Sequence, residues 1–203
     1  MFGGIVETIG TILNIELIDG CKQFTITPQK VFSDLNIGDS VSVNGICLTV
    51  TQFDDASFKI TAVPETLRLT NLNQLSTGSI VNLERSIKMS DRIGGHYLQG
   101  HIDTTGKILE IKHDNSNALL VKISIPETLA KYVINKGYIS LDGMSITVIQ
   151  AEINWFTVTF IPHTQAVTIV NQYKVNTLIN IEVDMMAKYI EKILGDRTNA
   201  TCH

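Results

Sequence analysis

The chain contains the same motif twice, and this repeat limits its possible folds more than any other feature. Residues 41–50 (VSVNGICLTV) are similar to residues 139–148 (ISLDGMSITV), at an offset of 98 residues. Two further pairs of segments share this offset: residues 64–66 with 162–164, and residues 80–84 with 178–182. Three matches in register indicate an internal duplication.

A fourth match lies at a slightly different offset. Residues 4–10 correspond to residues 100–106 at an offset of 96, so one insertion or deletion separates the two halves. We therefore expect two homologous domains over residues 1–96 and 97–184, followed by a C-terminal segment over residues 185–203.

Both halves have the composition of β-structure. Their segments are short, rich in Val, Ile and Thr, and separated by Gly, Asn and Asp, which is typical of strands and turns. The expected strands are residues 4–15, 22–27, 40–43, 46–52, 57–62 and 80–84, then 101–111, 118–125, 138–141, 144–151, 156–161 and 178–183. Six strands in each half predict a small closed barrel, because closure removes exposed sheet edges.

Few segments have helical character. Residues 126–134 predict a short helix, with a proline near its first turn. A last helix is expected to begin near Asp184 as N-cap. Its apolar face would contain Met185, Met186, Tyr189, Ile190, Ile193 and Leu194. This helix lies outside the repeat, so it either docks on the chain's own surface or pairs with other subunits; the polar tail over residues 196–203 is expected to fray.

Charge and cysteine content exclude several classes of function. The net charge of −4 and the absence of a cluster of Lys and Arg argue against nucleic acid or an anionic membrane as partner. The first residues do not combine a basic stretch with a long apolar core, and no apolar run of about 18 residues occurs, so neither secretion nor membrane spanning is expected. Cys21, Cys47 and Cys202 form no C-x-x-C pair, which favours reduced thiols in the cytoplasm. The five histidines are scattered, so no metal site is expected.

The repeated motif also indicates which side chains face outward. The apolar positions are Val41 and Val43, then Ile46, Leu48 and Val50, so their phase flips across the dipeptide Asn44-Gly45. This dipeptide predicts a two-residue type I′ turn or a bulged corner. In either case the opposite face has Cys47 and Thr49, and its twin has Ser145 and Thr147. Outward polar side chains are usually only solvated, but their recurrence indicates twin ligand sites.

One position distinguishes the two halves. His101 replaces Ile5, since the second half has Gly-His-Ile-Asp where the first has Gly-Ile-Val-Glu. A lone histidine is more often structural. An imidazole can nevertheless donate and accept protons near neutral pH, and it would reach Ser145 if the two strand ends are neighbours. The first half offers Cys47 instead, a more nucleophilic group than a serine hydroxyl.

These motifs together resemble the riboflavin synthase family. They are Met1-Phe2-x-Gly4-Ile5-Val6, Asn44-Gly45-x-Cys47-Leu48-Thr49-Val50, Glu65-Thr66-Leu67, Gly94-Gly95-His96, Gly100-His101-Ile102-Asp103 and Asp142-Gly143-x-Ser145-Ile146-Thr147-Val148. The resemblance covers residues 1 to 194 in the family's order. One departure is Gly3, where the family typically has Thr.

The resemblance implies an all-β fold of two six-stranded Greek-key barrels with a C-terminal helix that joins three chains. Each barrel would bind one 6,7-dimethyl-8-ribityllumazine, and one molecule would pass four carbons to the other without a cofactor or metal. The products are riboflavin and 5-amino-6-ribitylaminouracil. A further expected partner is lumazine synthase. Non-catalytic lumazine or flavin carriers of the same fold, and the flavin domain of an oxidoreductase, are the alternatives.

The resemblance also implies site residues. Cys47 and Ser40 would serve the N-terminal barrel, and His101 and Ser145 the C-terminal one. The pockets would be lined by Gly4, Ile5, Val6, Leu48, Thr49, Ala62, Val63, Pro64, Glu65, Thr66, Gly100, Ile102, Ile146, Thr147, Ile161, Pro162, His163 and Thr164. Lys136 would reach the ligand of a neighbouring chain.

Overall fold

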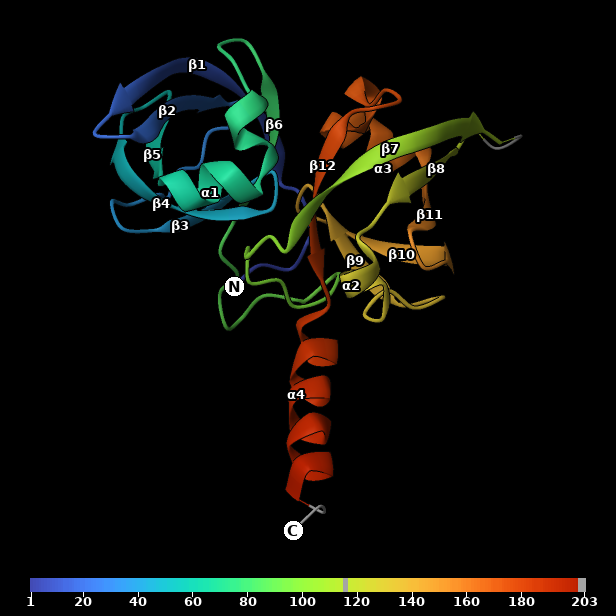
Figure 1. Cartoon of the computed structure of the whole chain (residues 1–203). Coiled ribbons are helices and arrows are strands. Elements are labelled where there is room, and N and C mark those ends of the chain that lie inside the picture. Colours follow the sequence, from blue (N-terminus) through green and yellow to red (C-terminus); the bar gives the residue numbers. More distant parts are fainter. Residues whose placement is uncertain (115–116, 201–203) are drawn as a thin grey trace.

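The computed structural model describes residues 1–114 and 117–200, with side chains described up to Leu194. It consists of two closed six-stranded antiparallel barrels that lie beside each other and a C-terminal helix that extends away from them (Figure 1). The all-β fold with two barrels and a terminal helix, as predicted, is confirmed.

The two barrels have the same strand order. The first contains β1 (Thr8–Ile18), β2 (Cys21–Pro28), β3 (Ser40–Val43), β4 (Ile46–Phe53), β5 (Phe58–Ala62) and β6 (Ile80–Arg85), in the order β1-β2-β5-β4-β3-β6. The second contains β7 (Thr104–His113), β8 (Leu119–Ser124), β9 (Tyr138–Leu141), β10 (Met144–Ala151), β11 (Trp155–Phe160) and β12 (Leu178–Val183), in the equivalent order. In each barrel the second strand pairs with the fifth and not with the third, as in a Greek key.

Irregularities in the strands repeat with the sequence. The register shift between Ile12 and Asn14 in β1 recurs between Ile108 and Glu110 in β7. The shift between residues 50 and 52 in β4 recurs between residues 148 and 150 in β10. Bulges bend strands and help a small sheet to close, so the duplication has kept the curvature of the barrel as well as its sequence.

The apolar series predicted from the sequence fills the barrel interiors. Val41, Val43, Ile46, Leu48 and Val50 are all buried in the first core. The dipeptide between β3 and β4 is a two-residue turn in which Asn44 and Gly45 both have positive φ, of 47° and 81°. Type I′ turns require this combination, so the first of the two predicted turn geometries is confirmed.

The two type I′ turns meet where the barrels touch. A Cβ on Gly45 would lie 2.6 Å from the backbone nitrogen of Gly143, so only glycine permits this approach. Around the turns, Nδ2 of Asn82 donates to the carbonyl of Asp142, and Nδ2 of Asn180 donates to the carbonyl of Asn44, both at 2.9 Å. These crossed hydrogen bonds relate the barrels by an approximate two-fold axis.

The structure differs from the prediction at the first strand of each half. The expected strands began at residues 4 and 101, but β1 begins at Thr8 and β7 at Thr104. Gly4 and Gly100 have φ of 72° and 78°, a left-handed backbone that ends extended structure. We call residues 3–6 the first strap and residues 99–102 the second strap.

Short helices follow the fifth strand of each barrel. They are α1 (Pro64–Leu69) with η1 (Asn71–Gln74), and α3 (Pro162–Val167) with η2 (Ile169–Gln172). No helix was predicted from the sequence at these positions. The helix expected over residues 126–134 is present as the shorter α2 (Glu127–Ala130).

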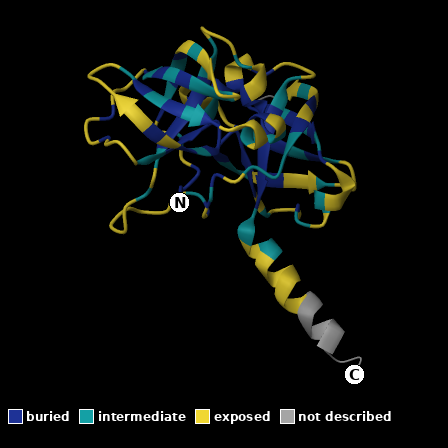
Figure 2. Ribbon diagram, turned by 60° about the vertical axis from the view of Figure 1, so that its left-hand side comes forward, coloured by how far each residue is buried: buried dark blue, intermediate teal, exposed yellow. Residues whose placement is uncertain are grey.

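The C-terminal helix α4 (Met185–Ala200) extends away from both barrels (Figures 1 and 2). Near its start Lys188 forms an ion pair with Asp103, and Glu191 forms one with Lys131. It begins directly after Asp184, whose side chain accepts a hydrogen bond from the amide of Met186 at 2.9 Å. Met186, Tyr189, Ile190 and Ile193 on its predicted apolar face are each more than half exposed. Of the two alternatives for this helix, docking of its apolar face on the chain's own surface is therefore wrong. The end of the tail, residues 201–203, lies outside the described residues.

Candidate active site

Each barrel presents a row of three polar side chains on its outer face. In the first barrel the register places Ser42 opposite Glu84 of β6 and opposite Cys47 of β4. In the second, Ser140 lies opposite Glu182 and opposite Ser145. Residues directly opposite each other share a face of the sheet. The two rows are therefore alike, except that one ends in a thiol and the other in a hydroxyl.

The two straps cross between the barrels and cover these rows. The carbonyl of Gly100, in the second strap, accepts a hydrogen bond from the amide of Cys47 at 2.9 Å. The carbonyl of Gly4, in the first strap, accepts one from the amide of Ser145 at 2.8 Å. Likewise Ile102 packs on the core of the first barrel and Val6 on the core of the second. The first strap thus leads into β1 of the first barrel but lies on the second barrel, and the second strap leads into β7 but lies on the first barrel.

A buried carboxylate fastens each strap at its other end. Glu84 accepts a hydrogen bond of 2.7 Å from the amide of Gly3. Glu182 accepts bonds from the amides of Gln99 and Gly100, at 2.7 and 2.9 Å. Burial raises the pKa of Glu84 and the pKa of Glu182 to about 7, although these amides act in the opposite direction. A Cβ at Gly3 would make only ordinary contacts, so the missing side chain leaves the fastening intact.

The structure does not pair His101 with Ser145. His101 is exposed on the second strap and follows Gly100, which contacts Cys47 of the first barrel. Ser145 Oγ instead lies 2.7 Å from Nδ1 of His96. The expected pairing is wrong within one chain, because the second strap crosses to the first barrel.

His96 is a candidate functional residue that the sequence reasoning missed. Its ring is buried and stacks on Tyr138, with 5.1 Å between centroids and 13° between planes. Burial lowers its pKa, which favours the neutral imidazole that can take the proton of Ser145. The available signal was the motif Gly94-Gly95-His96, which belongs to the family resemblance but was not carried into the set of site residues.

The two sites differ because their reactive residues differ. Tyr138 occupies the position in the repeat that Ser40 occupies in the first half. Ser40 lies opposite Thr49 on the Cys47 face, and Tyr138 lies opposite Thr147 on the Ser145 face. The first barrel therefore combines Ser40 and Cys47, whereas the second combines Ser145, His96 and an aromatic ring.

The other predicted binding residues lie along the same outer faces. Thr49 and Thr147 are exposed, and Thr66 and Thr164 are partly buried in α1 and α3. The exposed residues at the start of these helices are Val63, Pro64 and Glu65, and Ile161, Pro162 and His163. Ala62 and Leu48 point into the barrel core, so only their backbone can touch a ligand. Ile146 is partly buried in β10, and Lys136 is exposed, with its amide donating to the carbonyl of Val148 at 2.8 Å.

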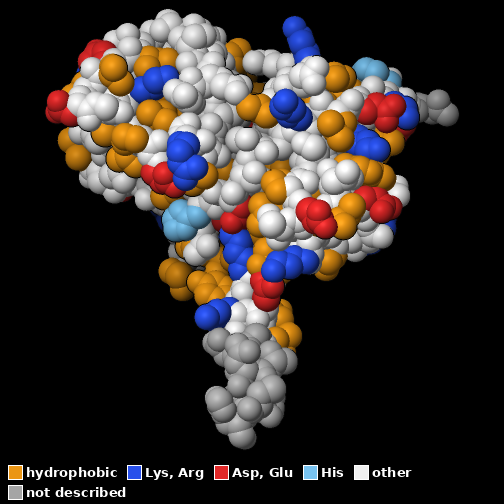
Figure 3. Space-filling view, viewed as in Figure 1, with side chains coloured by type: hydrophobic (Ala, Val, Ile, Leu, Met, Phe, Trp, Pro, Cys, Tyr) orange, Lys and Arg blue, Asp and Glu red, His pale blue; other side chains and the backbone are white. Residues whose placement is uncertain are grey.

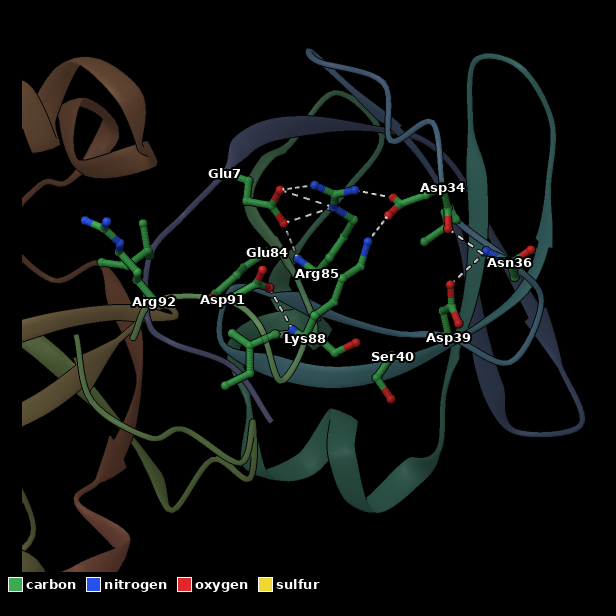
Figure 4. Close-up of a pocket in the computed structure, with 14 residues that line it drawn as sticks. Glu7, Asp34, Asn36, Asp39, Ser40, Glu84, Arg85, Lys88, Asp91 and Arg92 are labelled. Atoms are coloured by element: carbon green, nitrogen blue, oxygen red, sulfur yellow. Dashed lines mark hydrogen bonds and ion pairs between the residues drawn. The ribbon is translucent and has the colours of Figure 1, made fainter. Parts of the chain in front are cut away.

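A cavity of about 690 Å³ adjoins the first barrel at Ser40 and Ile5 (Figure 4). Its wall includes an ion-pair network in which Arg85 contacts Glu7 and Asp34, and Lys88 also contacts Asp34. Neither Cys47 nor residues 62–66 line this cavity. Apart from Ser40 and Ile5, the predicted binding residues therefore lie outside this cavity.

Metal and membrane features are both absent from the part of the chain that the structure describes. Within residues 1–114 and 117–200, no group of three or more His, Cys, Asp or Glu side chains is arranged to hold a metal ion. No helix over those residues has the length and apolar character needed to cross a bilayer.

Comparison with known proteins identifies relatives over nearly the whole chain. The family model described as "Lumazine binding domain" matches twice, at residues 3–86 and 99–184. The chain is 41% identical to a riboflavin synthase of Schizosaccharomyces pombe over 195 residues, which cover 96% of this chain and 94% of that protein. It is 44% identical to a riboflavin synthase of Bacillus amyloliquefaciens, over 96% of this chain and 90% of that protein.

A solved structure has the same fold. The crystal structure of LumP complexed with 6,7-dimethyl-8-(1'-D-ribityl) lumazine superimposes with a TM-score of 0.81 and covers 91% of this chain and 99% of that chain. Its sequence identity is 23%, so this likeness supports the arrangement of the barrels.

Proposed function

The chain belongs to the riboflavin synthase family, and we propose that it converts two molecules of 6,7-dimethyl-8-ribityllumazine into riboflavin and 5-amino-6-ribitylaminouracil. The enzyme is a transferase. One lumazine gives up four carbons and becomes the uracil, while the other gains them and becomes riboflavin. Every atom of the two substrates is found in the two products, so the reaction needs no external oxidant or reductant.

One observation carries this proposal: the chain has two similar outer faces that end in different reactive groups. Each face has a row of a carboxylate, a serine and a third polar residue, covered by a crossed strap. The third residue is Cys47 in one row and Ser145 in the other. A reaction between two copies of one substrate calls for two similar sites that treat the copies differently.

We assign the chemistry to the residues at these faces. Cys47, Ser40 and His101 serve the lumazine on the first barrel, with the Cys47 thiol able to add to the ring. On the second barrel, Ser145 and His96 form a hydrogen-bonded pair that can move a proton between the substrate and the imidazole. Holding two heterocycles in contact replaces a bimolecular encounter, which can lower the barrier by up to about 7–11 kcal/mol.

We propose that a complete site forms between chains. Thr49 and Thr147 of the two binding faces are exposed in a single chain. The exposed residues of α4 at positions 186, 189, 190 and 193 have the spacing of a helix–helix seam. Figure 3 shows hydrophobic side chains on this stalk below the barrels. A homotrimer joined through α4 would set the first barrel of one chain against the second barrel of its neighbour, with Lys136 at the shared ligand. The same proposal places the enzyme in the cytoplasm, with lumazine synthase as a partner.

Incubation of the purified protein with pure lumazine tests this function. We expect the absorbance of riboflavin to appear, with one riboflavin and one uracil product formed for every two lumazines consumed. A lumazine carrier would bind the compound and shift its fluorescence without consuming it. That outcome would overturn the proposed activity.

A further inference from the structure

We propose that Glu182 and Glu84 are positioning residues, and that each shapes the reactive site on the barrel opposite its own. Glu182, in β12 of the second barrel, would set the environment of Cys47 on the first. Glu84, in β6 of the first barrel, would do the same for Ser145 on the second. This inference rests on the proposed function where it concerns turnover, and on geometry alone where it concerns the straps.

The contacts of Glu182 give the most direct path. The residue is 2% exposed, and its two carboxylate oxygens accept hydrogen bonds from the amides of Gln99 and Gly100. The carbonyl of Gly100 in turn accepts the amide of Cys47. One residue of the second strap therefore bonds Glu182 on one side and Cys47 on the other, and His101 is the next residue along the chain.

The approach of this strap to Cys47 is close. A Cβ on Gly100 would lie 2.6 Å from the Cβ of Cys47, so the backbone of the strap lies directly against the thiol-bearing residue. Movement of the strap by a fraction of an ångström would change both the access to the thiol and the position of His101. Displacements of this size in a catalytic site have large effects on rate.

Glu84 has the equivalent role for the other strap. Glu84 is 5% exposed and accepts a hydrogen bond from the amide of Gly3. The carbonyl of the next residue, Gly4, accepts a hydrogen bond from the amide of Ser145. A Cβ on Gly4 would lie 2.6 Å from the Cβ of Ser145. The two connections are related by the approximate two-fold axis but end on different reactive residues.

Both carboxylates interact mainly with the straps. A buried carboxylate is costly unless it accepts hydrogen bonds, and both carboxylates accept theirs from backbone amides of the straps. The barrel interiors are filled by aliphatic and aromatic side chains and do not need these charges. The observation therefore favours a role in holding the straps over a role in holding the barrels.

The experiment compares Glu182→Gln, Glu84→Gln and the exposed control Glu16→Gln in the full chain. The first readout is the rate at which iodoacetamide alkylates Cys47, measured by peptide mass spectrometry with Cys21 as the internal reference. A glutamine at residue 182 has only one acceptor oxygen in place of the two that bond the amides of Gln99 and Gly100. We therefore expect Cys47 to be alkylated about threefold faster or more than in the wild type. Glu84→Gln and Glu16→Gln should leave the Cys47 rate at the wild-type value.

The second readout is riboflavin formation, for which we expect Glu182→Gln to lower kcat about tenfold or more. An unchanged Cys47 rate in Glu182→Gln, an equal rise in Glu84→Gln, or a parallel rise at Cys21 would overturn the inference. If Glu182→Gln does not fold by circular dichroism, Glu182→Asp takes its place, since it keeps the charge but withdraws it from the strap. A wild-type chain without turnover would overturn the proposed function alone, because alkylation does not depend on it.

Discussion

The hydroxyl of Tyr173 donates a hydrogen bond of 2.7 Å to the carboxylate of Asp142, at the contact between the two barrels. The same carboxylate accepts the amide of Asn180 and the side chain of Asn71, at 2.8 and 2.9 Å. Asp142 is fully buried, and its twin in the repeat is the uncharged Asn44. One half of the contact therefore has an ionisable group that the other half lacks.

This asymmetry predicts a pH dependence of stability. Burial raises the pKa of Asp142 from 3.8 to about 7, so the folded chain keeps a proton that the unfolded chain releases. The protonated Asp142 carboxyl therefore stabilises the folded chain fully below about pH 4. This stabilisation is lost as the pH rises through 7, and the loss is on the order of 4 kcal/mol. Urea unfolding at pH 5 and pH 8 should show a larger loss for the wild type than for Asp142→Asn.

Asp142→Asn also provides the control for this effect. Glu84 and Glu182 shift in the same direction but are present in both proteins, so the difference between the two curves isolates residue 142. The prediction fails if the difference in the free energy of unfolding between wild type and Asp142→Asn is the same at both pH values.

His96→Ala should slow turnover through its effect on Ser145. Without the imidazole at 2.7 Å, the Ser145 hydroxyl loses its proton acceptor, and we expect kcat to fall by about 100-fold or more with KM changed only slightly. Steady-state kinetics with His113→Ala, an exposed histidine of β7, as the matched variant would measure this. Wild-type kcat in His96→Ala would remove His96 from the mechanism.

Cys47→Ser and His101→Ala should each lower turnover and leave the affinity for lumazine nearly unchanged. Cys47 lies on the outer face of the first barrel and His101 on the strap that covers it, and neither belongs to the barrel core. We expect kcat to fall about tenfold or more, with the dissociation constant from fluorescence titration changed less than about threefold. Cys21→Ser is the control for loss of a thiol. Unchanged turnover in both variants would contradict the assigned roles.

Ile190→Glu should separate the chains. Ile190 is more than half exposed on α4, and a carboxylate in a helix–helix seam would have to be desolvated. We expect light scattering to give the mass of one chain in place of three, with loss of riboflavin formation. Ile153→Glu, an equally exposed position in the turn after β10, should keep both the mass and the activity. A trimer that survives Ile190→Glu would show that α4 does not hold it.

The barrels could be predicted from the sequence because their determinants are local. The alternation over residues 41–50 gave β3, β4 and the turn between them, since strand periodicity and turn residues are readable in a short window. α1 and α3 were not predicted, because six residues are too few to show a helical period and because their Pro-x-Thr motifs have the composition of a turn.

The arrangement of the site could not be predicted, because it depends on contacts that are distant in sequence. Residues 4–7 have the composition of a strand, and nothing in that segment shows that Gly4 reaches Ser145 on the other barrel. The His96–Ser145 contact joins residues 49 positions apart. Sequence reasoning assigned the candidate site residues to the two barrels by chain order, whereas in the structure each strap lies on the other barrel.

The exchange of straps also bears on how such a chain could arise. A protein of half this length could build the same pair of barrels by associating with a copy of itself, each copy lending its first residues to the other across an isologous contact. In that ancestor both borrowed segments would have been identical by necessity. Fusion of two gene copies would give each segment its own codons, so that the residues now found as Ile5 and His101 could diverge and the two halves could become unlike.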